Sequence, residues 1–303
     1  MNTVTCGVGR SADRPSLDEV ARRIDQISTL PHVALRVMEV ASNPDAGPGD
    51  LKRAMESDAA LCAKVLRCVN SAAYGLRTKV SNLQQAIAYL GMKQVRNLAM
   101  AAQIADLFKS DEAIGPYRRS ALWRHLVSVG VCGRLLAMRI RLAAFEDVFL
   151  AGLLHDIGII LEDQHVHRGF VKVLESLDGS RPLTQVEHEH LGFDHTTLGA
   201  RLAEQWRFPE GARAAIRYHH ASELYRGDAR LILLCVEVAN AICTCKGITS
   251  VGLKAARLGR GVLEDLSLSK EDLVVIAQDL DRELAENATL LDIGSHGAQR
   301  HRS

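Results

Sequence analysis

Proline, the residue least compatible with a helix interior, occupies seven positions of this 303-residue chain. None lies between Gly49 and Gly115, and none follows Pro209. Aromatic residues make up 4% of the sequence, and runs that alternate β-branched with polar residues are scarce. The chain therefore lacks both the helix breakers and the strand signals of a mixed fold. The sequence predicts an all-α protein.

Local chemistry marks several helix ends. Asp58 is placed as the N-cap of a helix whose apolar stripe begins at Leu61. Ser81 and Gln84 have the spacing of a capping box, and Gly91 is placed to end the helix that they open. Periodicity predicts further helices over residues 17–28, 32–41, 49–57, 92–109, 118–140, 146–158, 165–178, 182–190, 194–206, 209–221, 228–246 and 270–285.

One polar segment divides the helical pattern in two. Residues 110–116 contain the Gly115-Pro116 pair and separate two long helical blocks. We expect an N-terminal helical bundle over residues 17–115 and a second helical subdomain over residues 116–286. The polar ends, residues 1–16 and 287–303, are expected to be mobile.

The charge balance gives no indication of a polyanionic partner. Lys plus Arg number 37 and Asp plus Glu number 36, so the net charge is +1. A chain without a strong overall field is not expected to bind nucleic acid or a membrane surface. No apolar run approaches the ~20 residues that span a bilayer, and the N-terminus has no signal-peptide pattern, so we expect a cytoplasmic protein.

The seven cysteines are best explained as reduced thiols, most of them at apolar helical positions. Cys243 and Cys245 form a C-x-C pair, but a helix would point the two sulfurs apart. No second pair lies at the spacing of a zinc site. We therefore expect no cysteine-based metal site.

The chemistry of the chain centres on adjacent ionisable residues in an apolar run. His155 and Asp156 follow Phe149–Leu154, and ionisable groups in such surroundings need partners. A single histidine on an apolar helix face is more often a hydrogen-bonded core residue than a ligand. Several that converge in one subdomain favour a shared cation or a polar network. The predicted cluster consists of His125, His155, Asp156, His195, His219 and His220.

These residues stand in motifs that resemble the HDOD domain, a branch of the HD metal-dependent phosphohydrolase superfamily. The similar segments run from about Ile27 to Cys245. They include Leu30-Pro31, residues 58–61 and 69–75, residues 122–125, 152–158 and 192–195, and residues 218–220. The resemblance implies an N-terminal helical bundle packed on an HD-like helical subdomain.

The resemblance also implies a mono- or dinuclear site held by the six residues of the cluster, with Asp156 as the bridge between two ions. Iron, manganese, zinc, nickel or magnesium would be the divalent ion, and no organic cofactor is expected. Catalytic relatives add an aspartate on a later helix, where this chain has Asn240. With a single carboxylate, a second ion should bind more weakly. Glu237 could replace the missing ligand only if its helix turned by about 60°.

We therefore expect a non-catalytic regulatory output module for signal transduction that retains the histidine-rich pocket and contacts a signalling protein. The alternative is a metal-dependent phosphohydrolase acting on a nucleotide or phosphodiester, in which Asp156 and a water held by the metal would carry the chemistry. The Gly-Tyr-Pro motif of cyclic-di-GMP phosphodiesterases is absent after the double histidine, where residues 221–228 stand. The sequence does not specify an oligomeric state.

Overall fold

The computed structural model describes residues 15–27, 32–43, 45–110, 113–253 and 257–294. Their regular secondary structure is helical, apart from a short antiparallel pair of strands, β1 (Ala113–Ile114) and β2 (Tyr117–Arg118). The predicted all-α class is confirmed. In the described part of the chain, no helix combines the length and the apolar character needed to cross a membrane.

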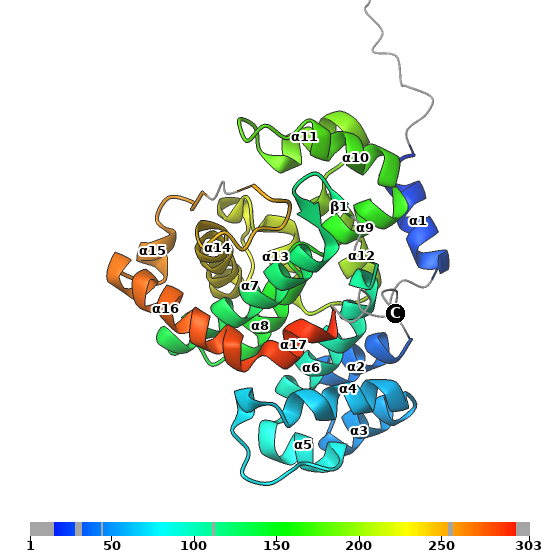
Figure 1. The fold of residues 1–303 in the computed structure, drawn as a ribbon, viewed down its shortest axis with the longest axis vertical. Coiled ribbons are helices and arrows are strands. Elements are labelled where there is room, and N and C mark those ends of the chain that lie inside the picture. Colours follow the sequence, from blue (N-terminus) through cyan, green and yellow to red (C-terminus); the bar gives the residue numbers. More distant parts are fainter. Residues whose placement is uncertain (1–14, 28–31, 44, 111–112, 254–256, 295–303) are drawn as a thin grey trace, which may run out of the picture.

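The N-terminal half is a bundle built around one buried helix (Figure 1). Helix α6 (Met92–Ile104) is buried from Val95 onward and packs against α2 to α5. It continues into the 3-10 turn η2 (Ala105–Phe108). The remaining elements of this half are α1 (Leu17–Ile27), α2 (His32–Ser42), α3 (Pro48–Glu56), α4 (Ala59–Val69), η1 (Ala72–Tyr74) and α5 (Leu83–Leu90).

Helix caps in this half follow the sequence with one correction. Asp58 accepts a hydrogen bond from the backbone N–H of Leu61, as predicted for an N-cap. Helix α5 begins one residue later than expected, because Asn82 caps it by accepting from the N–H of Gln85. The Ser81–Gln84 capping box is therefore wrong. The Ser81 hydroxyl donates to the Gln85 side chain instead. The three-residue spacing of an N-cap contact recurs one position later, between Asn82 and Gln85.

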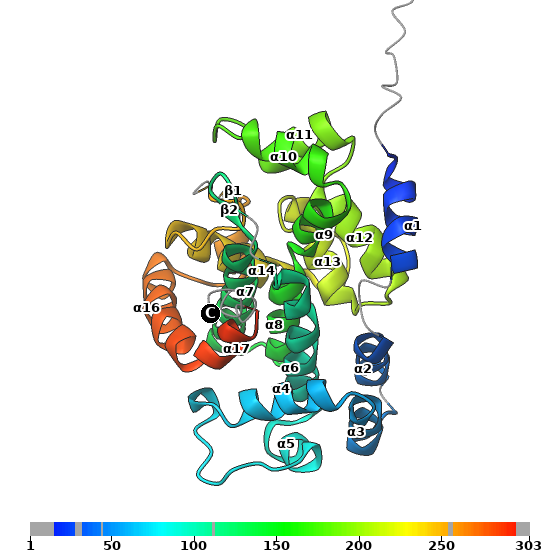
Figure 2. The same ribbon diagram turned by 45° about the vertical axis from the view of Figure 1, so that its right-hand side comes forward.

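The second half surrounds α7 (Arg119–Arg139), whose middle is completely buried. It packs against α8 (Phe145–Leu154), α14 (Arg230–Cys245) and α16 (Lys270–Glu286) (Figures 1 and 2). Gly130 and Gly152 allow α7 and α8 to approach closely, because a Cβ on Gly152 would lie 2.8 Å from the Cα of Gly130. This crossing fixes α8, and therefore the residues that follow it, against α7.

The chain breaks at the His-Asp pair, where the sequence predicts one continuous helix over residues 146–158. Helix α8 ends at Leu154, and α9 (Ile157–His165) begins after Asp156. Asp156 has φ −103° and ψ 19°, outside helical geometry. Periodicity missed the break because apolar residues continue on both sides of it. The consequence is that His155 and Asp156 lie at a junction between two helices.

The other helices of this half are α10 (His167–Glu175), α11 (Leu183–Leu191), α12 (His195–Gln205), α13 (Glu210–Tyr218), η3 (Ser222–Leu224) and α15 (Val262–Asp265). Helices α10 and α11 pack together above α9, away from the N-terminal bundle (Figure 2). Helix α1 lies along α9 and α12, so the first helix of the chain contacts the second half.

The last described residues differ from the mobile tail expected over residues 287–303. Helix α17 (Ala288–Ile293) buries Leu290 and Ile293, and the Trp123 indole donates a hydrogen bond to the carbonyl of Leu291. Its six residues are too few to give a periodic signal. Residues 1–14 and 295–303, also expected to be mobile, lie outside the described residues, as does the Leu30-Pro31 motif.

Candidate metal centre

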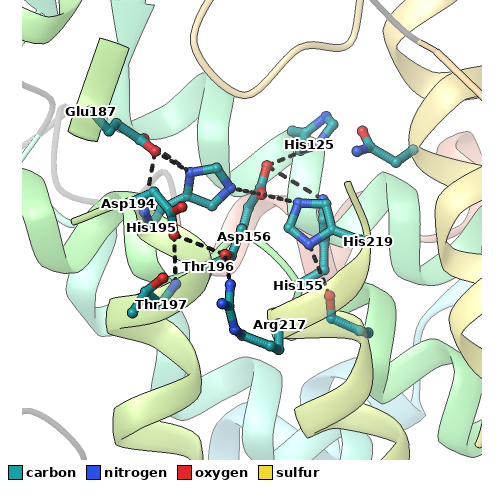
Figure 3. Close-up of polar contacts among 12 residues, drawn as sticks. His125, His155, Asp156, Glu187, Asp194, His195, Thr196, Thr197, Arg217 and His219 are labelled. Atoms are coloured by element: carbon teal, nitrogen blue, oxygen red, sulfur yellow. Dashed lines mark hydrogen bonds and ion pairs between the residues drawn. The ribbon is translucent and has the colours of Figure 1, made fainter. Parts of the chain in front are cut away.

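Five helix ends or faces bring the predicted histidines to one place (Figure 3). His125 lies in the middle of α7, and His155 and Asp156 form the junction of α8 and α9. His195 is the first residue of α12. His219 and His220 directly follow α13. All six residues gather around one centre, and all except the exposed His220 are buried.

The carboxylate of Asp156 is the centre of the arrangement. Its two oxygens lie within 3.1–3.6 Å of the Nε2 atoms of four histidines. His219 is nearest, at 3.1 Å, and His125 is farthest, at 3.6 Å. His220 joins the group through its ring, whose centroid is 5.2 Å from that of His195. Figure 3 shows the labelled imidazoles on both sides of the carboxylate.

The other ring nitrogen of three histidines is bonded to a backbone carbonyl. The Nδ1 atoms of His125, His155 and His219 lie 2.7–2.8 Å from the carbonyl oxygens of Ile248, Gly152 and Ala215, respectively. A carbonyl can only accept, so Nδ1 must carry the proton and donate it. In the neutral ring, Nε2 is then an acceptor that faces the carboxylate.

His195 is held by a carboxylate instead. Its Nδ1 lies 2.7 Å from Glu187 Oε2, and its backbone N–H donates to the same oxygen at 3.2 Å. Glu187 is fully buried on α11. This arrangement orients the ring so that Nε2 points to Asp156, which lies 3.4 Å away. A carboxylate on the far nitrogen also makes an imidazole a stronger metal ligand.

The polar atoms that face one another lack hydrogen-bond partners among the described residues. These atoms are the Nε2 atoms of His125, His155, His195 and His219 and the Oδ1 atom of Asp156, all buried. Acceptor atoms that face one another repel unless a proton or a cation lies between them. The donor set, imidazole nitrogens with one carboxylate, suits a divalent transition metal. The residues therefore fit a metal ion.

The ligand atoms form two groups that share Asp156. In the first, His125 and His155 join Asp156; in the second, three histidines, His195, His219 and His220, join it. Within each group, the candidate ligand atoms lie within 4.8 Å of one another. A shared carboxylate between two groups is the arrangement of a dinuclear site.

The electrostatics of the cluster favour neutral rings at His125 and His219 beside an ionised Asp156. Burial and the neighbouring His155 lower the pKa of His125 to about 4. Burial also lowers the pKa of His219. Burial alone would raise the pKa of Asp156, but the charge of His155 and the ring nitrogens around it hold that pKa well below its ordinary value. Neutral imidazole and ionised carboxylate are the forms that bind metal.

Two glutamates behind His195 belong to the site and were not part of the predicted set. Burial alone would lower the pKa of His195, but the Glu187 carboxylate raises it well above its ordinary value. Glu162 on α9 is fully buried beside Glu187; burial and the charge of Glu187 raise the pKa of Glu162 well above its ordinary value. Burial and Glu187 thus favour the neutral form of the Glu162 carboxyl group. The sequence does offer one signal for Glu162, because this ionisable residue directly follows the apolar run Ile157–Leu161.

Helices α9 and α12 meet at a glycine next to the cluster. A Cβ on Gly158 would collide with the backbone carbonyl of His195. Only a residue without a side chain allows the start of α9 to approach the start of α12 this closely. Gly158 thus determines how near His195 can come to Asp156.

Asn240, the expected replacement for a further aspartate ligand, lies half-buried on α14. Its amide oxygen accepts a hydrogen bond from the Thr244 hydroxyl at 3.3 Å. Glu237 belongs to neither ligand group, and its Oε1 accepts from the backbone N–H of Gly259 at 2.6 Å. Among the described residues, Asp156 is the one carboxylate that joins the two ligand groups.

The fold is similar to several solved structures. An HDOD domain protein of unknown function from Geobacter sulfurreducens matches with a TM-score of 0.73 and 27% identity, covering 91% of this chain and 97% of that one. A protein from Marinobacter aquaeolei VT8, provisionally described as a signal transduction protein, matches with a TM-score of 0.73 and 24% identity over 93% of this chain and 65% of that one. A provisionally described phosphohydrolase from Shewanella amazonensis SB2B matches with a TM-score of 0.70 and 21% identity over 91% and 98%.

A curated relative, an uncharacterized protein of Treponema pallidum (strain Nichols), is 27% identical over 203 residues. The match covers 66% of this chain but 39% of the relative, so the relative is considerably longer than the shared part. The model of the HDOD domain family matches residues 27–222, more than half of the chain. The predicted resemblance is confirmed: this chain belongs to the HDOD domain family.

Proposed function

We propose that this protein is a non-catalytic output module of signal transduction that keeps a divalent metal in its histidine-rich pocket and acts through contact with a protein partner. The observation that carries the proposal is the single carboxylate, Asp156, among five imidazoles. Two divalent ions bring a formal charge of +4, of which one direct carboxylate offsets one unit. The second ion should therefore bind weakly, which leaves a nucleophile for two-metal hydrolysis poorly organised.

A metal in this pocket would serve to connect helices. Its ligands would come from α7, from the α8–α9 junction, and from the starts or ends of α12 and α13. Binding to the folded state alone adds to the free energy of unfolding, so the ion would hold these helices in one arrangement. Such a module could present a fixed surface to a partner. Imidazole-rich ligand sets favour zinc, iron, nickel or manganese over magnesium, which prefers oxygen.

The second candidate is a metal-dependent phosphohydrolase, and the open side of the site favours it. His220 is exposed at the cluster, and Arg217 donates to the hydroxyl of Thr196, the residue after His195 (Figure 3). A phosphate ester that enters from this side would meet a cation. A bound divalent ion would polarise the phosphoryl oxygen and lower the pKa of a water. The phosphohydrolase description of the Shewanella amazonensis protein agrees with this alternative.

The two candidate functions predict different results in one assay. The full chain, loaded with zinc or manganese and checked for metal content, is incubated with bis(p-nitrophenyl) phosphate and with nucleotides. The output-module proposal predicts bound metal and no hydrolysis above the metal-only blank. Hydrolysis that Asp156→Ala abolishes would establish the phosphohydrolase, and the output-module proposal would then be abandoned.

A further inference from the structure

A cavity of about 910 Å³ lies on the opposite side of α9 from the N-terminal bundle, between α1, α9, α10 and α11. Both ribbon views show α10 and α11 stacked above α9, with α1 beside them (Figures 1 and 2). The residues of the metal cluster do not line it. Its polar lining consists mainly of nitrogen-bearing side chains: Arg23, His165, His167, Arg168, Lys172 and His190.

Within the described part of the chain, three cations of this cavity have no ion-pair partner. Arg168 and Lys172 are one turn apart on α10, and Arg23 projects from α1; all three are exposed. None of them makes an ion pair within 4 Å of another described residue, whereas Arg119, on the far side of α9, is paired with Asp163 at 2.6 Å. Glu175 is the acidic residue in the lining. Three cations against one carboxylate leave a charge of about +2.

His165 also lines the cavity. This residue is the last of α9 and is half-buried, and its Nε2 is buried with no hydrogen-bond partner among the described residues.

The rest of the lining is apolar. Val166, Val171, Leu191 and Phe193 form this part together with Pro15. The volume falls within the range of pockets that hold small organic ligands. A phosphate monoester at neutral pH carries a charge of about −1.5 to −2 on three acceptor oxygens, which matches the excess of cations. Arginine in particular suits the geometry of phosphate oxygens.

We propose that this cavity is a binding site for a small organic phosphate monoester, with the phosphate held by Arg23, Arg168 and Lys172 and the organic part against the apolar wall. The site stands apart from the metal cluster and does not depend on the proposed function. It would give the protein an input for a soluble ligand on helices that also carry Glu162 and Glu187, the pair behind His195.

The test is isothermal titration of the full chain in buffer with EDTA, using AMP, glucose 6-phosphate and inorganic phosphate as probes. Both esters are expected to bind saturably, and at least one should bind about tenfold more tightly than inorganic phosphate, because only an ester reaches the apolar wall. The preferred ester distinguishes a nucleotide from a sugar phosphate. No saturable binding of either ester at millimolar concentration would overturn the proposal.

Variants locate the binding. Arg168→Gln combined with Lys172→Gln changes two exposed residues and should weaken ester binding about tenfold or more, by loss of charge-assisted hydrogen bonds. Arg22→Gln is the matched control, because Arg22 is also exposed on α1 but lies outside the cavity lining. It should leave the affinity unchanged. Equal affinity in the double variant, or equal weakening by the control, would place the binding elsewhere and refute the site. Since EDTA removes divalent ions, failure here leaves the metal proposal intact.

Discussion

The two ligand groups that share Asp156 differ in number, exposure and support. The first, His125 with His155, offers three ligands and is completely buried. The second, His195 with His219 and His220, offers four ligands and reaches the surface through His220. A four-ligand set of this kind can satisfy a tetrahedral ion, whereas a three-ligand set leaves a position open. The difference indicates that the second group binds its ion more tightly.

The two groups also differ in what lies behind the imidazoles. Both histidines of the first group donate to backbone carbonyls, those of Ile248 and Gly152. In the second group, His195 is backed by the charged carboxylate of Glu187. Backing by a carboxylate raises the basicity of the ligand more than backing by a neutral carbonyl. The metal affinity of each group therefore depends on the hydrogen-bond partners of its histidines as well as on the ligands themselves.

The largest expected effect comes from removing what the groups share. Asp156→Asn keeps the size of the side chain but deletes the carboxylate that the two ligand groups share, so both positions should lose metal. The loss in affinity should exceed the ~100-fold that outer hydrogen-bond partners contribute. Elemental analysis after dialysis measures it. Asp194→Asn is the control, because it removes a charge next to His195 while leaving an acceptor for the α12 N-cap. Equal metal loss in both variants would contradict a ligand role for Asp156.

Single histidine variants separate the groups. His219→Gln should abolish the tighter binding step, and His125→Gln should leave that step in place while removing the weaker one. The reason is that each residue belongs to one group only. Competitive titration with a zinc-binding chromophore resolves the two steps. If His125→Gln removed the tighter step, the ranking of the groups would be reversed.

The pH dependence of stability tests the first group without metal. The pKa of His125 is lowered from 6.5 to about 4, so the folded state resists a proton that the unfolded chain accepts. Its contribution to stability is therefore complete above pH 6.5 and is lost as the pH falls towards 4. The loss is on the order of 3 kcal/mol. Urea unfolding in EDTA should show a shallower acid slope for His125→Gln than for the original chain. If the free energy of unfolding fell equally with pH in the two proteins, His125 would not be held neutral.

The smallest of these effects concerns the support of the second group. Glu187→Gln preserves an acceptor for His195 but removes the charge, and should weaken the tighter metal step by about 10- to 100-fold. Glu189→Gln, two residues along α11 and exposed, should change nothing. Zinc titration compares the two variants. Unchanged zinc affinity in Glu187→Gln would show that the Glu187 carboxylate does not strengthen metal binding by His195.

The fold and the cluster were largely accessible from the sequence, because each depends on short-range signals. His125 sits three residues after Leu122 and four before Val129, and that spacing was enough to place its ring in the interior. The break between α8 and α9 was not accessible, since apolar residues continue through it and only the backbone angles of Asp156 reveal it.

The supporting residues were harder to predict for a different reason. Glu162 and Glu187 are charged residue types, which periodicity assigns to the surface, and their burial depends on α9, α11 and α12 packing together. Similarly, Leu290 and Ile293 are buried because α17 packs against α4 and α7. Tertiary contacts of this kind leave no mark on local spacing. The cationic cavity, which four separate helices form, is a further case.

The most direct test of the metal pocket is a crystal structure of the zinc-loaded chain with anomalous data at the zinc edge. We predict an anomalous peak about 2.0–2.2 Å from the Nε2 atoms of His195 and His219 and from an oxygen of Asp156. A second, weaker peak is predicted between Asp156, His125 and His155. Crystals grown with excess zinc that show no peak at Asp156, with each imidazole bonded only to protein or water, would contradict the account.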